Sequence, residues 1–149
     1  MRPSPLIIRR RPPRSTAVAL LQSHGLPVAD ITDEHLKHFF FIGSDGSPTG
    51  LVGIELHGTA ALLRSLVVAA GDRTQGVGAA LVQHAEDYAV SREISALYLL
   101  TTTAESFFER RGYCRVDRTQ SPPAIQATPE FAEICPANSA FMIKRLQGR

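Results

Sequence analysis

Residues 66–82 read LVVAAGDRTQGVGAALV and combine an apolar strand, a glycine-rich bend and the start of an amphipathic helix. Gly76 and Gly78 let the backbone approach a ligand closely, because neither residue has a Cβ atom. A helix that begins at this bend directs unpaired N–H groups and the positive end of its dipole toward the bend. This combination binds phosphate or pyrophosphate, and Arg73 adds a charged donor at the rim.

Two common phosphate-binding fingerprints do not fit the bend. A P-loop requires Lys and Ser or Thr after its second glycine, whereas Val77 and Gly78 follow Gly76. A dinucleotide fingerprint requires a third glycine where this chain has Leu81. The pattern that remains is Arg-x-x-Gly-x-Gly, which an ordinary strand-to-helix turn would also explain.

A second block, residues 97–113, reads LYLLTTTAESFFERRGY and makes the interpretation more specific. Residues 73–78 look like the acetyl-CoA pyrophosphate loop of the GNAT acetyltransferases. The second block resembles the A-x-x-F-Y-x-x-x-G-F signature of the same family. The matching positions are Ala104, Phe107, Gly112 and Tyr113. The resemblance covers about residues 39–116, with both signatures in the family's order.

One position departs from the family pattern. The tyrosine that often protonates the leaving CoA thiolate in this family falls at Phe108, which cannot donate a proton. Three explanations are open. Another side chain could donate the proton, the thiolate could leave with help from water or the helix dipole, or the activity could be lost. Tyr98 and Tyr113 are the nearby phenols, and we expect each to pack with its hydroxyl at a surface.

The resemblance implies an α/β (α+β) GNAT fold over a single domain, residues 1–149. Its central mixed sheet would have six to seven strands with flanking helices, and a V-shaped splay between the fourth and fifth strands. Hydrophobic periodicity and turn residues predict strands at 6–10, 39–42, 50–56, 61–68, 96–101, 113–117 and 140–146. The same signals predict helices at 15–23, 30–37, 76–90, 104–111 and 128–133.

The family's co-substrate is acetyl-CoA, and the resemblance assigns residues to it. Backbone groups of the strand that ends at Val68 would pair with the pantetheine, and one N–H would stabilise the oxyanion. The residues expected to bind acetyl-CoA are Leu66, Val67, Val68, Arg73, Thr74, Gln75, Gly76, Val77, Gly78, Ala79, Thr103, Ser106 and Phe108.

Polar residues within apolar strands are the candidates for chemistry on the acceptor. Glu55 is the expected catalytic base; its alternative is a solvated position on the polar face of its strand. Arg64 is expected to bind an acceptor carboxylate, and its alternative is a structural salt bridge with Glu55. Ser65 and Thr101 are expected to contact the substrate, although Thr101 would also suit a cap for the following helix.

The histidines give weaker signals. His57 lies beside a glycine turn, where we expect a surface position. His35 and His38 have a spacing that suits a metal on a helix, but no third ligand stands nearby, so we expect no metal.

A closer resemblance bears on the acceptor. Residues 62–68 (LLRSLVV), 99–108 (LLTTTAESFF) and 125–140 (IQATPEFAEICPANSA) look like the GNATs encoded with arsenic-resistance genes. They are also similar to the acetyltransferase domain of short N-acetylglutamate synthases. The resemblance implies N-acetylation of a small amino-acid-like acceptor, such as an arsenical or a glutamate analogue. The alternatives are a protein or peptide N-acetyltransferase and a non-catalytic CoA-binding regulator.

Composition limits the partners. The 149 residues carry a net charge of only +2, which does not favour nucleic acid. Arg9, Arg10, Arg11 and Arg14 crowd the N-terminus, where we expect a strand and a solvated turn. No apolar run is long enough for a membrane helix or a secretory signal, so we expect a cytoplasmic enzyme. A homodimer through residues 140–146 remains open.

The two cysteines fit the same environment. Cys114 and Cys135 have no metal-ligand spacing, and we expect both to stay reduced. Cys114 is expected to be a small core residue at the start of a strand.

Overall fold

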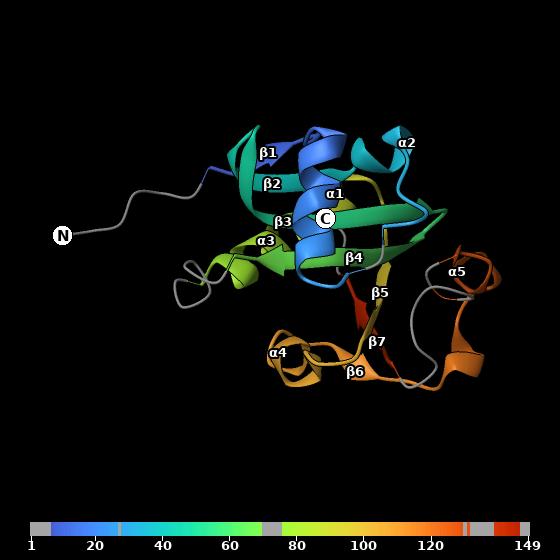
Figure 1. Ribbon diagram of the computed structural model, residues 1–149. Helices are drawn as coiled ribbons and strands as arrows, with labels where there is room; N and C mark the ends of the chain where they lie inside the picture. Colours follow the sequence, from blue (N-terminus) through green and yellow to red (C-terminus); the bar gives the residue numbers. More distant parts are fainter. Residues whose placement is uncertain (1–6, 27, 70–75, 130, 132–138, 147–149) are drawn as a thin grey trace. The chain divides into compact units, whose positions relative to one another are not determined.

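The computed structural model of the chain describes residues 7–26, 28–69, 76–129, 131 and 139–146 (Figure 1). Its elements are strands and short or medium helices, and a strand overlaps each predicted strand range. In chain order these elements are β1 (Arg9–Arg10), α1 (Arg14–Ser23), α2 (Asp33–Leu36), β2 (Phe39–Ser44), β3 (Ser47–His57), β4 (Ala60–Val68), α3 (Val77–Ser91), β5 (Ala96–Thr101), α4 (Glu105–Glu109), β6 (Cys114–Arg115), a 3-10 turn η2 (Arg118–Gln120), α5 (Pro123–Gln126) and β7 (Ala140–Arg145).

The described strands form one seven-stranded mixed sheet in the order β1-β2-β3-β4-β5-β7-β6. The pairing of β4 with β5 is parallel and runs from Ala60↔Ala96 to Leu62↔Tyr98. β5 then pairs antiparallel with β7 along its whole length. The mixed sheet with flanking helices confirms the predicted fold class, while the V-shaped splay stays a prediction.

The chain divides into two compact units, each built from two segments. Unit 1 comprises Met1–Gly53 and Ser65–Ala85, and unit 2 comprises Ile54–Arg64 and Glu86–Arg149. The single domain predicted for residues 1–149 stays a prediction.

In unit 1, α1 covers the hairpin formed by β2 and β3. Asp45 and Gly46 make a two-residue turn between Ser44 and Ser47, so both strands run further toward the turn than predicted. The hairpin is tightly packed at Gly53, where an added Cβ would lie 2.4 Å from the ring of Phe39. The apolar side chains that pack in this unit are Ala17, Leu21, Ile31, Leu36, Phe39, Phe41, Leu51 and Val67.

Both helices of the N-terminal segment begin at different residues from those predicted. α1 begins at Arg14 after Pro13, and no side chain caps it, so Ser15 is not the predicted cap. α2 begins after Thr32, whose hydroxyl accepts the N–H of His35 while the His35 ring accepts the N–H of Thr32. This capping box fixes the short helix at Asp33–Leu36.

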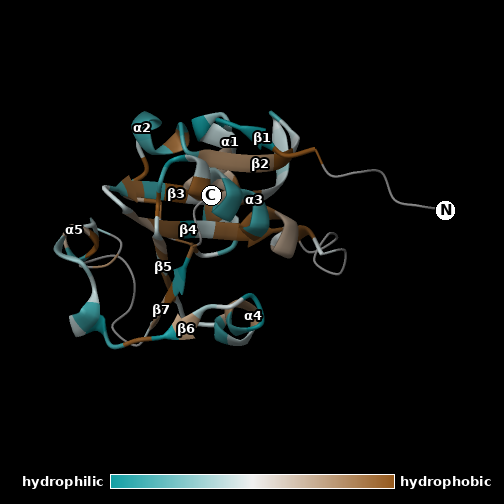
Figure 2. Cartoon of the chain, turned by 180° about the vertical axis from the view of Figure 1, so that it is seen from behind, coloured by the Kyte–Doolittle hydropathy of each residue, from teal (hydrophilic) through white to brown (hydrophobic). Residues whose placement is uncertain are grey.

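β4 contains a residue in the left-handed region. Ser65 has φ 60°, which is uncommon for a residue with a side chain inside a strand. Arg64 and Ser65 are both buried, like the three residues that precede them in β4. Figure 2 shows that β4 is mostly hydrophobic, whereas α2 is mostly hydrophilic.

In unit 2, β7 lies between β5 and β6 in the sheet. The core side chains of unit 2 are Leu62, Ala96, Tyr98, Ile125 and Phe141. Because β6 pairs with Met142 and Ile143, that part of β7 is not an open edge, and the homodimer stays a prediction. α5 was missed in the sequence; the predicted cap at Thr128 is present, since its hydroxyl accepts the N–H of Phe131. Among the described residues, no helix is long and apolar enough to cross a membrane.

Candidate active site

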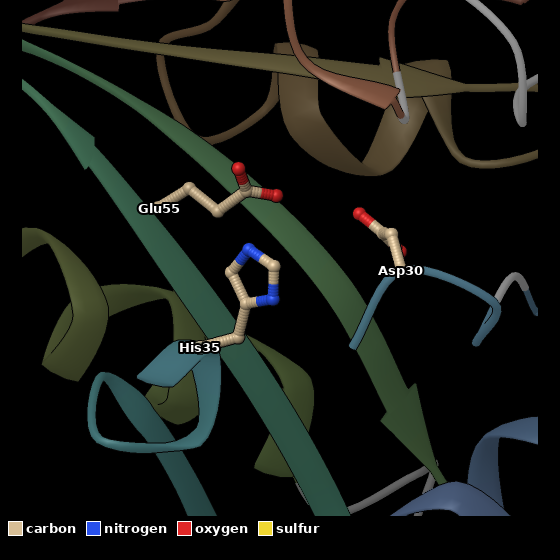
Figure 3. Close-up of side chains that lie close together, drawn as sticks. All are labelled: Asp30, His35 and Glu55. Carbon is tan, nitrogen blue, oxygen red and sulfur yellow. The ribbon is translucent and has the colours of Figure 1, made fainter. Parts of the chain in front are cut away.

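Glu55 and Arg64 form a buried ion pair on neighbouring strands of unit 2. Arg64 Nη1 lies 2.6 Å from Glu55 Oε2, and the two side chains are 0% and 5% exposed. Figure 3 shows the Glu55 carboxylate extending from β3; Asp30 and His35, also drawn there, belong to unit 1. The solvated alternative for Glu55 is therefore wrong, and the alternative salt bridge is present.

His57, predicted at the surface, is partly exposed and also contacts this pair. Its Nε2 atom lies 3.3 Å from Glu55 Oε1, the carboxylate oxygen that does not face Arg64. Residues two apart on a strand share a face, which brings the two side chains together. The His57 side chain is 25% exposed, so it joins the buried pair to solvent.

The two other predicted acceptor residues lie on β4 and β5. Ser65 is buried at the left-handed position that follows Arg64. The hydroxyl of Thr101 accepts the N–H of Ala104 at 3.0 Å, just before α4. The capping alternative for Thr101 is thus present, and its contact with substrate stays a prediction.

The predicted pyrophosphate loop is described only in part. Arg73, Thr74 and Gln75 lie outside the described residues. Gly76 has φ +71°, a conformation that L side chains rarely adopt, and an added Cβ would meet no atom of the described residues within 4 Å. The next residue begins α3, whose first turn presents N–H groups that the helix itself does not bond.

The remaining predicted cofactor residues differ in exposure. Val67 packs in the core of unit 1, while Leu66, Val68, Gly78 and Ala79 are half-buried. Val77 is buried at the start of α3. In unit 2, Thr103 and Ser106 are exposed around the start of α4.

Phe108 lies in an aromatic cluster and not at an exposed position. Its ring makes edge contacts with Phe107 at 5.1 Å and with Tyr113 at 5.4 Å, and it is 4% exposed. Burial explains why an apolar side chain suits this position. Its predicted contact with the cofactor stays a prediction.

Tyr113 does not have the predicted hydroxyl at a surface, while the position of the Tyr98 hydroxyl stays a prediction. Tyr113 is buried and donates to Glu86 Oε2 at 3.0 Å, while Lys144 Nζ lies 2.9 Å from Glu86 Oε1. Burial, reinforced by the Glu86 carboxylate, raises the pKa of Tyr113 well above its ordinary value. Tyr98 is buried and stacks on Phe141 at 5.4 Å. Tyr113 is therefore a poor proton donor for a leaving thiolate.

Other polar residues noted in the sequence have structural contacts. Arg9 pairs with Asp45 at 2.9 Å, and Arg10 Nε donates to the carbonyl of Lys37 at 2.6 Å. The capping role of His35 explains its place at the start of α2. Cys114 is exposed, which corrects the prediction of a core position. Cys135 lies outside the described residues.

Comparison with known proteins identifies the family. The model of the acetyltransferase (GNAT) family matches residues 10–113, so the chain belongs to that family, which confirms the prediction of an acetyltransferase. An uncharacterised N-acetyltransferase of Chlorobaculum tepidum is 30% identical over 93 residues, which are 62% of this chain and 59% of that protein. The match thus spans less than two thirds of the curated relative.

Solved structures share the fold. N-acetylglutamate synthase from Neisseria gonorrhoeae, solved with coenzyme A and N-acetyl-glutamate, superimposes with a TM-score of 0.82 at 20% identity, over 98% of this chain and 36% of that one. Rv2747 from Mycobacterium tuberculosis, also solved with CoA, gives a TM-score of 0.74 at 16% identity, over 95% of this chain and 99% of that one. At these identities the likeness concerns the fold.

Proposed function

We propose that this chain is an N-acetyltransferase that moves the acetyl group of acetyl-CoA to the amino group of a small amino-acid-like acceptor. The observation that carries the proposal is the buried Arg64–Glu55 pair, which joins a carboxylate-binding group to a carboxylate. An amino acid presents the complementary pair, a carboxylate and an ammonium. Membership of the GNAT family supports the acetyl transfer.

The start of α3 suits the pyrophosphate of acetyl-CoA. Gly76 has a positive φ, no described atom lies within 4 Å of where its Cβ would stand, and the N–H groups of α3 follow directly. Arg73, Thr74 and Gln75 would add donors from the loop. Backbone groups of residues 66–68 would pair with the pantetheine, and one N–H would stabilise the tetrahedral oxyanion.

The acceptor chemistry uses both members of the ion pair. Arg64 would bind the acceptor carboxylate through its planar guanidinium. Glu55 would then take a proton from the ammonium, so that the amine attacks the acetyl carbon. A C–N bond forms, the C–S bond breaks, and the thiolate leaves without help from a tyrosine at position 108.

Glutamate-like acids and arsenical analogues are the acceptors to test first, as the resemblance of residues 62–68 suggests. Release of CoA thiol from acetyl-CoA should occur with one of these classes in a panel of free amino acids and phosphonate analogues. A panel that gives no release, with acetyl-CoA still bound, would contradict the proposal. It would favour a peptide acceptor or a CoA-binding regulator.

Gly76→Glu should abolish this release. A glutamate there strains the backbone and sets a negative charge at the helix N-terminus where the pyrophosphate would lie. Gly25→Glu is the matched control, because Gly25 also has φ +71° and open space for a Cβ. Equal loss of activity in both variants would mean that backbone strain, and not phosphate binding, explains the effect.

A further inference from the structure

Glu55 must release each proton that it takes from the acceptor before it can act in the next turnover, and this requirement follows from the proposed function. Its Oε2 atom faces Arg64, whose side chain is fully buried. A proton kept on Glu55 would also weaken this buried ion pair. A proton taken from the acceptor therefore needs a route onward.

The other carboxylate oxygen supplies that route. Oε1 lies 3.3 Å from Nε2 of His57, while Oε2 lies 2.6 Å from Arg64 Nη1. Imidazole is the side chain that ordinarily gains and loses a proton near neutral pH. Since a quarter of the His57 side chain is exposed, its ring contacts both the buried carboxylate and solvent.

We propose that His57 is a positioning and proton-relay residue that acts through Glu55, a proposal that rests on the proposed function. The acceptor ammonium gives one proton to Glu55 Oε1, which passes it to Nε2 of a His57 tautomer that carries its hydrogen on Nδ1. Nδ1 then releases a proton to water, and the carboxylate returns to its pairing with Arg64. The amine forms the C–N bond, the C–S bond breaks, and the second amine proton goes to the thiolate through water.

The surroundings of His57 suit this exchange. Its ring contacts the Glu55 carboxylate, and Arg64 contacts the other oxygen of that carboxylate. The neighbouring Gly58 and Thr59 form the exposed turn between β3 and β4, so the ring lies beside a solvent-exposed turn.

The test is His57→Gln, which keeps an amide beside Glu55 but cannot carry a proton. We expect kcat to fall about 100-fold, with the KM for acetyl-CoA unchanged. The dependence of kcat/KM on pH should also differ from that of wild type, because the relay group has been removed. His24→Gln is the matched control, since His24 is exposed and its ring contacts the Leu20 carbonyl; it should behave as wild type.

His57→Ala keeps the proposal testable if the glutamine variant folds poorly. Added imidazole should restore its turnover in proportion to the neutral imidazole present, which a purely structural role would not produce. A folded His57→Gln enzyme with the kcat and pH profile of wild type would overturn the relay, as would His57→Ala that imidazole does not restore. Failure of wild type itself to transfer acetyl groups would instead overturn the proposed function.

Discussion

Glu55 and Glu86 are both buried carboxylates of unit 2, and each contacts a cation and a third side chain. Glu55 pairs with a fully buried arginine and a partly exposed histidine. Glu86 pairs with a lysine that is 27% exposed and with the buried hydroxyl of Tyr113. In the Glu55 cluster the cation, Arg64, is buried and the third side chain, His57, is partly exposed. In the Glu86 cluster the cation, Lys144, is partly exposed and the third side chain, Tyr113, is buried.

This inversion separates a site that can exchange protons from one that cannot. A proton can move between Glu55 and solvent through His57, while Arg64 keeps the site charged. Burial and the Glu86 carboxylate hold Tyr113 protonated, so its contact fixes β6, α3 and β7 together within unit 2. Five variants test whether the two clusters differ in this way.

The largest effect is expected from Arg64→Met. It leaves the Glu55 carboxylate buried without its cation, which should lower the free energy of unfolding by about 3–5 kcal/mol. Acetyl transfer should be lost as well, because the acceptor carboxylate loses its guanidinium. Urea unfolding and CoA-thiol release measure the two effects.

A double variant separates stability from chemistry in this cluster. Glu55→Leu combined with Arg64→Met removes both charges, so most of the lost stability should return while activity stays absent. A double variant no more stable than Arg64→Met alone would mean that the pair is not the source of the loss.

The next largest effect is a contrast between Glu55→Gln and Glu86→Gln. Glu55→Gln should lower kcat about 100-fold, because the amide cannot accept the acceptor's proton. Glu86→Gln should leave kcat near wild type and lower the free energy of unfolding by only about 1–3 kcal/mol, because Lys144 can turn to water. Similar losses of kcat in the two variants, measured by CoA-thiol release, would remove the distinction.

The sequence predicted the parts of this comparison that depend on local periodicity. Strand patterning placed Glu55 and Arg64 on neighbouring strands, and their ion pair was one of two alternatives for Arg64. The parallel pairing of β4 with β5 also followed from two apolar strands joined through a helix. The family signatures predicted the fold that the sheet order confirms.

Contacts between distant residues were not predictable in the same way. Tyr113 reaches Glu86 across 27 positions and Lys144 reaches the same carboxylate across 58, so no local pattern signals that the phenol is buried. The contact of His57 depends on the direction in which the Glu55 carboxylate turns, which alternation along β3 does not determine. The left-handed backbone at Ser65 was not predictable either, because the residue is neither a glycine nor an asparagine, the types that commonly adopt this conformation.

The smallest effect is expected from Tyr113→Phe, which removes one hydrogen bond and no charge. We expect a loss of about 1 kcal/mol in the free energy of unfolding at neutral pH, and an unchanged kcat. The pH dependence is the sharper readout. Because the pKa of Tyr113 is raised in the fold, its stabilising effect is fully present below the ordinary tyrosine pKa of about 10. Above that pH the unfolded chain ionises first, so wild type should lose stability as pH rises.

Tyr113→Phe should lose less stability than wild type over that alkaline range, because it lacks this ionisation. Thermal unfolding midpoints of the two proteins, compared between neutral pH and pH above 10, measure the difference. Parallel curves would mean that Tyr113 ionises as readily in the fold as in the unfolded chain. The phenol would then be a proton donor after all, and the Glu86 cluster would resemble the Glu55 cluster more than its geometry indicates.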